Sequence, residues 1–277
     1  MDEPIAARAL EWRGQIGAES STQTHIVNAK DEDDNRLDLV VKFKENLAHT
    51  RGNYRGTSLA CELICSMIGR EIGLPVPDYY VVELSGDFVN GLPPKNNVIK
   101  LFAKNKKYIF GTPKLSSFDD WPTNHISVNG NILRQFKKTI CFDGAVMNGD
   151  RRQGNPNILW DGGGSVRLID HALALATVYN NRGNSPSPSH PFPKDKFQDH
   201  ATVPSLRENG EPNDLYSLLY RRWENRIDSN FLDTVRSLVP NEWERTGSSD
   251  LNKIFSFLED RDSSFSTMES TISEVIS

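Results

Sequence analysis

Features that mark secreted and membrane proteins are missing from this sequence. Its 277 residues contain only three cysteines and no Asn-x-Ser/Thr acceptor site for glycosylation. No apolar run approaches the roughly 20 residues that a membrane-spanning helix needs. Residues 1–12 carry early acids and lack the apolar core of a signal peptide. A small, odd number of cysteines without secretory features is typical of a reducing compartment, so we expect a cytoplasmic protein without membrane association.

An excess of basic charge is also missing. The chain has 32 Lys and Arg against 37 Asp and Glu, which gives a net charge of −5. A chain with this balance is not expected to bind DNA directly through its whole surface. Residues 93–114 nevertheless contain six lysines and no acid, which favours either a solvated loop or a basic stripe that attracts an acidic partner. The six histidines show no ligand spacing, so no structural zinc is expected.

The pattern of apolar residues indicates an α+β protein in two parts. Strand patterns come early, over residues 24–27, 37–43, 79–84 and 107–110. A helix with an apolar stripe is predicted over 58–72, ending at Gly73. After about residue 113 the pattern is mostly helical, with helices expected near 132–140, 214–226, 228–239 and 250–258. We therefore expect a strand-rich part over 1–112 and a helical part over 113–262, joined near Gly111 to Pro113.

Three segments depart from this scheme. Residues 157–169 predict a β-hairpin, because two short apolar runs flank the turn sequence Asp161-Gly-Gly-Gly-Ser. Residues 180–213 are rich in Asn, Ser, Pro and Gly, which indicates a long functional or mobile loop. Residues 263–277 are rich in Ser, Thr and Glu, which favours a flexible tail.

The densest polar group lies on the two sides of the predicted hairpin. Because the arms of a hairpin are antiparallel, Asn155 or Asn157 should come close to Asp170. An amide oxygen and a carboxylate suit Mg²⁺, which prefers oxygen ligands and retains waters and phosphates. Asp150 precedes Asn155 by five residues and is placed to orient or deprotonate a hydroxyl. The alternative is that these are turn residues, since Asn and Asp are favoured in turns for backbone reasons alone.

Two weaker signals concern phosphate binding. Lys42 ends a strand and Glu62 lies early in the next helix, and such a pair can hold nucleotide phosphates; the alternative is a solvated lysine and a surface glutamate. Residues 14–23, which include Gly17, Ser20 and Ser21, can lay backbone N–H groups over phosphates, or form an ordinary polar loop. No Gly-Lys dipeptide occurs, so this segment is not a Walker A motif.

Taken together, these residues resemble the HipA-like kinases, within the wider protein-kinase and phosphoinositide-kinase superfamily. The matching pieces are Val-Val-Lys42-Phe, Glu62 in a helix that closes on Gly-Leu-Pro-Val-Pro, the Asp150-x₄-Asn155 spacing, and Leu-Ile-Asp170-His. The similarity spans roughly residues 14–175. It implies a bilobal protein-kinase-like fold with a strand-rich N-lobe, and a helical C-lobe that carries a metal-site β-hairpin.

The resemblance also implies a reaction, in which the γ-phosphoryl group of Mg²⁺-ATP passes to a Ser/Thr hydroxyl of a protein substrate. Lys42 and Asp150 would be catalytic, Glu62 would hold Lys42 on the phosphates, Asn155 and Asp170 would bind the metal, and Gly17, Ser20 and Ser21 would cover the phosphates. It extends to a role as a toxin or stress effector with an inhibitory partner protein. The alternatives are a small-molecule or lipid-headgroup kinase, and a catalytically silent nucleotide-binding scaffold.

Overall fold

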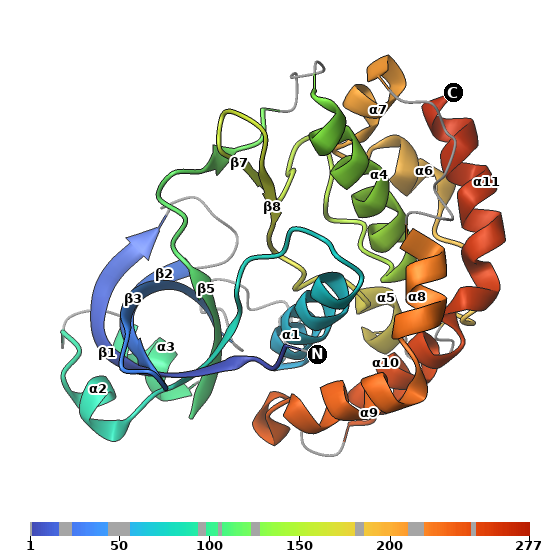
Figure 1. Ribbon diagram of the computed structural model, residues 1–277. Coiled ribbons are helices and arrows are strands. Elements are labelled where there is room, and N and C mark those ends of the chain that lie inside the picture. The colour runs from blue at the N-terminus through green and yellow to red at the C-terminus, as the bar shows by residue number, and fades with distance from the viewer. Residues whose placement is uncertain are drawn as a thin grey trace.

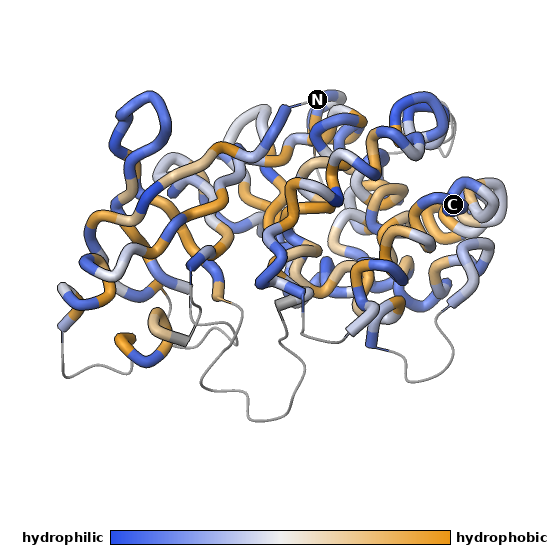
Figure 2. Tube along the Cα trace, turned by 90° about the horizontal axis from the view of Figure 1, so that it is seen from below, coloured by the Kyte–Doolittle hydropathy of each residue, from blue (hydrophilic) through white to orange (hydrophobic). Residues whose placement is uncertain are grey.

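The structure, a computed structural model, has a strand-rich part and a helix-rich part (Figure 1). It describes residues 2–16, 24–43, 56–93, 98–104, 107–122, 128–180, 186–209, 219–244 and 248–277. Each part has its own hydrophobic core. Hydrophobic residues run along the inside of both parts and hydrophilic residues occupy protruding loops (Figure 2). In the described part of the chain, no helix is long and apolar enough to cross a membrane.

Five strands of the N-terminal part close into a barrel in the order β1-β2-β3-β5-β4. They are β1 (Ile5–Ile16), β2 (Thr24–Asp31), β3 (Arg36–Lys42), β4 (Tyr80–Glu83) and β5 (Tyr108–Pro113). Alternate residues of β2 and β3 point inward, so that Val27 and Leu39 face each other across the register and are fully buried. Two short helices, α2 (Gly86–Asn90) and α3 (Val98–Lys104), add Phe88 and Phe102 to this core.

Of the five barrel strands, all except β1 were predicted from the sequence. That strand buries only the small residues Ala7 and Ala9 along its first half, and charged side chains occupy several of the positions between and after them. Its apolar alternation is therefore too weak to recognise in the sequence. β1 nevertheless closes the barrel, because it pairs antiparallel with β2 and parallel with β4.

Helix α1 (Gly56–Glu71) lies between the barrel and the C-terminal helices (Figure 1). The sequence predicted an apolar stripe on this helix, but every residue from 57 to 69 is buried. The side opposite the stripe carries small residues such as Ser58, Cys65 and Ser66, which allow neighbouring elements to pack closely. A helix buried all round belongs to a core. As predicted, it stops at Gly73, whose φ of 78° suits glycine.

The C-terminal part begins with α4 (Gly130–Ala145), which is capped by Asn129 through a 3.0 Å bond from the Ile132 N–H. The predicted hairpin is present as β7 (Ile158–Trp160) and β8 (Val166–Leu168), with β6 (Asp119–Asp120) on its outer edge. The other elements are α5 (Ala176–Asn180), α6 (Lys194–Gln198), α7 (Val203–Asn209), α8 (Arg221–Arg226), α9 (Ser229–Leu238), η2 (Asn241–Trp243), α10 (Asp250–Glu259), η3 (Arg261–Ser264) and α11 (Phe265–Ile276).

The segment 180–213, predicted to be one long loop, contains α6 and α7 instead. Both helices are short and are separated by polar residues, so they leave no helical period that spans the segment. Their buried side chains, Phe197, Val203 and Leu206, are nevertheless part of the C-terminal core. The described residues 186–209 are therefore held in place by packing that their composition does not reveal.

The prediction of a flexible tail over 263–277 is wrong. Helix α11 occupies this segment and packs against α4, α6 and α7. Its buried residues Phe265, Met268, Ile272 and Ile276 recur three or four positions apart, which is one face of a helix. The Ser, Thr and Glu residues that suggested disorder fill most of the opposite, solvated face.

We predict that Ile272→Ala lowers the free energy of unfolding by about 2–5 kcal/mol, because it leaves a cavity in the core beside α4. Ser266→Ala, an exposed change on the same helix, should stay within about 0.5 kcal/mol of the wild type. Urea denaturation of both variants measures the difference. Equal stabilities would show that α11 is not part of the folded core.

Candidate functional site

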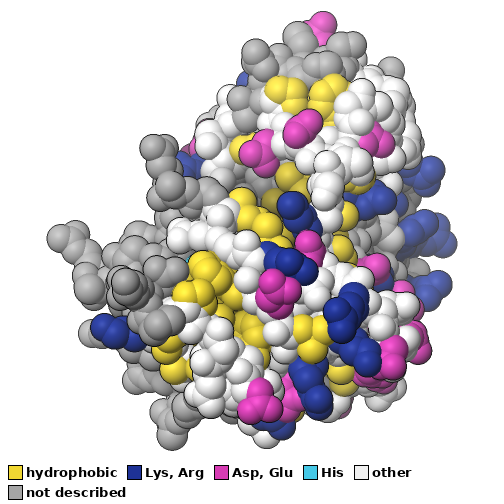
Figure 3. Space-filling model, turned by 90° about the vertical axis from the view of Figure 1, so that its left-hand side faces the viewer, with side chains coloured by type: hydrophobic (Ala, Val, Ile, Leu, Met, Phe, Trp, Pro, Cys, Tyr) yellow, Lys and Arg dark blue, Asp and Glu magenta, His cyan; other side chains and the backbone are white. Residues whose placement is uncertain are grey.

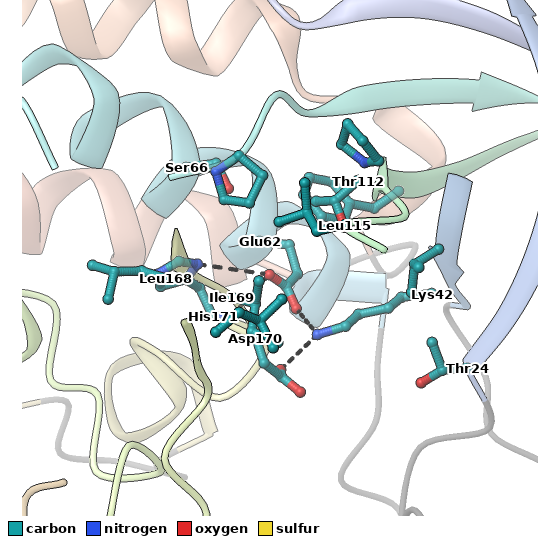
Figure 4. A pocket seen from close by; sticks show the side chains of 15 residues that line it. Thr24, Lys42, Glu62, Ser66, Thr112, Leu115, Leu168, Ile169, Asp170 and His171 are labelled. Atoms are coloured by element: carbon teal, nitrogen blue, oxygen red, sulfur yellow. Dashed lines mark hydrogen bonds and ion pairs between the residues drawn. The ribbon is translucent and has the colours of Figure 1, made fainter. Parts of the chain in front are cut away.

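A cleft lies between the barrel and the helical part (Figure 4). Its apolar walls come from both parts, with Val40 of β3 and Phe110 of β5 on one side and Leu159 of β7 and Leu168 of β8 on the other. Charged side chains gather at one end, where Lys42, Glu62 and Asp170 point toward one another. The cleft thus combines two apolar walls, which suit a planar ring, with one charged end.

Lys42 lies between two carboxylates at the charged end. Its Nζ forms an ion pair with Oε1 of Glu62 and a second one, 2.7 Å long, with Oδ1 of Asp170. Oε2 of Glu62 accepts a 2.9 Å hydrogen bond from the backbone N–H of His171. Glu62 is only 1% exposed. The two elements on either side of the cleft, β3 and the segment after β8, are therefore joined through one side chain of α1.

The pKa values of the three groups reflect burial and their mutual charges. Burial alone favours neutral Lys42, but the charges of Asp170 and Glu62 outweigh it and raise the pKa of the lysine. Burial also opposes ionisation of Asp170, but Lys42 lowers the pKa of this carboxyl. Burial raises the pKa of Glu62, and Lys42 opposes that effect. Lys42 is thus held as a cation, and its charge favours the ionised forms of Glu62 and Asp170.

Asp150 lies just before a tight turn, which brings Asn155 back beside Asp150. Backbone hydrogen bonds join residues 152 and 155 in both directions, at 3.1 and 2.8 Å. Asn155 Nδ2 consequently donates to Asp150 Oδ2 at 3.0 Å, and Asn157 Nδ2 donates to the same oxygen at 3.4 Å. Asp150 and Asn155 are both partly exposed. The carboxylate is thus oriented by two amides and is open to a ligand.

The hairpin joins the two groups, as the sequence predicted. The N–H of Ile169 donates to the carbonyl of Asn157 at 3.1 Å, so the residues on the two sides of the hairpin meet at its base. Asn157 and Asp170 have φ values of 48° and 58°. Asn and Asp are the non-glycine residues that tolerate this region best, so they are turn residues as well as candidate site residues.

The oxygen atoms at the base of the hairpin fit a hard cation. Asn155 uses its amide nitrogen on Asp150, which leaves its amide oxygen to ligate, and Asp170 uses Oδ1 on Lys42, which leaves Oδ2. Within the described residues, no group of three or more His, Cys, Asp or Glu side chains could hold a metal alone. Mg²⁺ fits such a site only when waters or phosphate oxygens complete its ligands.

Arg151 holds the base of the hairpin together from inside the protein. Its guanidinium donates to the carbonyl of Asn157 before the hairpin and, at 3.3 Å, to that of Ile169 after it. Nε donates to Oδ2 of Asp143 on α4 at 2.6 Å, and both side chains are fully buried. The charge of Arg151 contributes to lowering the pKa of Asp143 to about 2, against burial, which raises it. Neither residue was recognised in the sequence.

A family model described as HipA-like kinase matches residues 44–269 of this chain. The chain belongs to the HipA-like kinase family. The matched range contains Glu62, Asp150, Asn155 and Asp170, and Lys42 lies just before it. No curated protein matches the chain significantly. Among solved structures, the Helicobacter pylori proinflammatory kinase CtkA is similar at 14% identity over 96% of this chain and 94% of its own, with a TM-score of 0.48.

The family predicted from the sequence is therefore confirmed. Some of the predicted site residues lie together in the structure. The structure brings Lys42 together with Glu62 and Asp170, and Asp150 together with Asn155. Gly17, Ser20 and Ser21 lie outside the described residues, so their contact with phosphates stays a prediction. Thr24, the first residue of β2 after them, lines the cleft.

One described lysine of the stripe over residues 93–114, Lys107, has an acidic neighbour. Lys107 lies 3.7 Å from Glu83 and packs over the ring of Tyr108, while Lys95 and Lys106 lie outside the described residues. On the face of this HipA-like kinase drawn in Figure 3, Lys and Arg side chains are interspersed with Asp and Glu. Both interpretations of this segment, a solvated loop and a basic stripe that attracts an acidic partner, stay predictions.

His171 follows Asp170 and was predicted to be a structural hydrogen-bonding residue. It is buried, and Nη2 of Arg151 lies 3.2 Å from its Nε2. Because arginine only donates, Nε2 accepts this bond and the ring is neutral. Burial and the charge of Arg151 lower its pKa to about 3, which does not suit a general base at neutral pH.

The buried histidines predict a pH dependence of stability. His171 and His25 have pKa values of about 3 and about 4, against 6.5 in the unfolded chain. Below pH 6.5 the unfolded state therefore binds more protons, and stability falls on acidification. We expect the free energy of unfolding to drop between pH 6.5 and 4, approaching about 1.4 kcal/mol per pH unit for each histidine.

Urea denaturation across this pH range measures the slope. His25→Gln should remove about half of the histidine contribution, because one of the two groups no longer titrates. A stability that does not change from pH 7 to pH 5 in the wild type would contradict the burial of both rings.

Proposed function

We propose that this HipA-like kinase transfers the γ-phosphoryl group of Mg²⁺-ATP to a Ser or Thr hydroxyl of a protein. The observation that carries the proposal is the Lys42–Glu62–Asp170 group in the cleft, together with the oriented pair of Asp150 and Asn155. Family membership gives the phosphotransferase activity. We further propose that the two parts act as the lobes of a protein-kinase-like fold, with the nucleotide between them.

The apolar walls of the cleft suit the adenine ring. Val40 and Phe110 of the barrel line the cleft together with Leu159 and Leu168 of the hairpin, so a flat ring bound there would have apolar contacts from both parts. The charged end then receives the phosphates. Lys42 is held there by Glu62, so its ammonium is fixed before any ligand arrives.

Nucleotide binding would exchange the partners of Lys42. The lysine would turn from Asp170 to the phosphates and keep its bond to Glu62. Asp170 and the amide oxygen of Asn155 would hold Mg²⁺, which neutralises charge on the phosphates when it is bound. Lys42, Glu62 and Asp170 would therefore each have an opposite charge beside them both with and without the nucleotide.

Asp150 is the residue best placed to act on the acceptor. Its carboxylate is fixed by the amides of Asn155 and Asn157 and is partly exposed, so a hydroxyl can approach it and donate its proton. Gly149 and residues 152–154 beside it are exposed. An open approach of this kind favours a hydroxyl carried on a protein over a small molecule that needs an enclosed pocket.

The cytoplasmic location, the inhibitory partner protein and the role as a toxin or stress effector stay predictions. They rest on the cysteine count and on the family resemblance, and no contact in the described residues bears on them. A small-molecule or lipid-headgroup acceptor and a silent scaffold are outcomes that the following experiments distinguish.

We expect Asp150→Asn to lower phosphoryl transfer by at least about 10²-fold, the usual effect of a lost general base. Affinity for Mg²⁺-ATP should be unchanged, because Asp150 bonds to Asn155 and Asn157 and not to Lys42. Incorporation of labelled phosphate into the chain itself or into proteins of a lysate measures transfer.

Asp161→Asn is the matched control. Asp161 lies at the exposed tip of the same hairpin, where its Oδ1 accepts the N–H groups of Gly163 and Ser165, and an amide oxygen can do the same. This variant should behave as the wild type. ATP binding without transfer to any acceptor by the wild type would favour the scaffold, and equal transfer by Asp150→Asn would contradict the assigned site.

We expect Asp170→Asn to abolish the effect of Mg²⁺ on nucleotide affinity, because it removes the charged metal ligand. Titration calorimetry with a non-hydrolysable ATP analogue, with and without Mg²⁺, measures this. Wild-type affinity should rise when the metal is added and that of the variant should not. If Mg²⁺ strengthens binding equally in both proteins, the metal is held elsewhere.

A further inference from the structure

A buried histidine far along the chain joins the site without taking part in the chemistry described above. His200 is 1% exposed and lies in the segment that follows Asp170. Beside it the backbone runs antiparallel to the segment that carries Asp150. The N–H of Gln153 donates to the carbonyl of Asp199 at 3.0 Å, and the N–H of Ala201 donates to that of Arg151 at 3.2 Å.

The side chain of His200 locks this pairing. Its Nδ1 accepts a 3.3 Å bond from the N–H of Thr202, so the ring proton is on Nε2. Nε2 therefore donates to Oδ2 of Asp143, at 2.9 Å. This is the same oxygen that accepts from Arg151, so one buried carboxylate holds the segment that carries Asp150 and the segment around residue 200 together.

The anchored segment borders Asp150. Helix α6 precedes His200 directly and lies against Gly149, where a Cβ atom would come within 3.5 Å of Cδ of Lys196. Gly149 and Lys196 are both exposed. An acceptor that brings a hydroxyl to Asp150 past Gly149 would therefore meet α6.

We propose that His200 is a positioning residue, which fixes the acceptor side of the site through Asp143. The proposal rests on the kinase function proposed above. Arg151 and Asn148 still bind Asp143 when His200 is absent, at 2.6 and 2.9 Å, so the orientation of Asp150 and the nucleotide site do not depend on it. The position of residues 199–201 does.

The test compares His200→Ala with His200→Gln, whose amide nitrogen can donate to Asp143 in place of Nε2. His190→Ala, at an exposed histidine of the same segment, is the matched control. Hydrogen exchange measures the amides of Gln153 and Ala201, which make the cross bonds. Steady-state kinetics with casein as the Ser/Thr probe measures KM for the acceptor and for ATP. The rate of ATP hydrolysis without an acceptor is measured separately.

In His200→Ala we expect exchange at Gln153 and Ala201 to speed up, and KM for casein to rise, by roughly tenfold each, the effect of one lost hydrogen bond to a charged group. KM for ATP and ATP hydrolysis should stay within about twofold, since a change of that size is below the effect of one hydrogen bond. His200→Gln should restore most of both changes, and His190→Ala should match the wild type.

Unchanged exchange in His200→Ala would overturn the proposal. So would an equal loss of ATP hydrolysis and of transfer to casein, because that pattern reports general damage to the fold. If the wild type hydrolyses ATP but phosphorylates neither casein, nor itself, nor any protein of a lysate, the proposed protein-kinase function fails, and the exchange result still decides whether His200 anchors the segment.

Discussion

A carboxylate buried in a helix that has no solvent-facing side is the constraint on which the site depends. Glu62 lies in the middle of a stretch where every residue is inaccessible, and an unpaired charge there would cost several kcal/mol. Two donors compensate it, the ammonium of Lys42 and the backbone N–H of His171. Because these come from β3 and from the segment after β8, satisfying one charge fixes both sides of the cleft.

Contacts with the C-terminal helices fix the position of α1 and therefore of Glu62. Thr57 at its start bonds to Asp250 of α10 at 3.2 Å, and the helix packs against η2 and α9. Glu62 is thus anchored in the core of the C-terminal part, and its bond to Lys42 forms without movement of the helix. The contact that would change in the proposed nucleotide complex is the one between Lys42 and Asp170.

The elements that the sequence revealed are those with local signals. Strand alternation, the stop at Gly73 and the Asp-Gly-Gly-Gly turn each depend on neighbouring residues, and the candidate site residues were proposed from their places beside these predicted elements and from the family resemblance. The burial of Glu62 could not be read in this way, because it follows from small residues on the far face of α1 and from helices some 170–190 residues further on.

The positions that escaped prediction depend on long-range contacts or on composition. Asp143 and His200 are 57 residues apart and meet only through the folding of the intervening chain. Helix α11 was hidden by its Ser and Thr residues, although its buried face has an ordinary helical spacing. In both cases the deciding information lies in tertiary packing, which outweighs local propensity.

A double-mutant cycle on Mg²⁺-ATP affinity tests the central claim most directly, that buried Glu62 holds Lys42 in place for the phosphates. Titration calorimetry would compare the wild type, Lys42→Met, Glu62→Gln and the double variant. Each single change should weaken binding, and the double variant should bind about as Lys42→Met does, with a coupling free energy above about 0.5 kcal/mol. Additive losses, or unchanged affinity in Glu62→Gln, would contradict it.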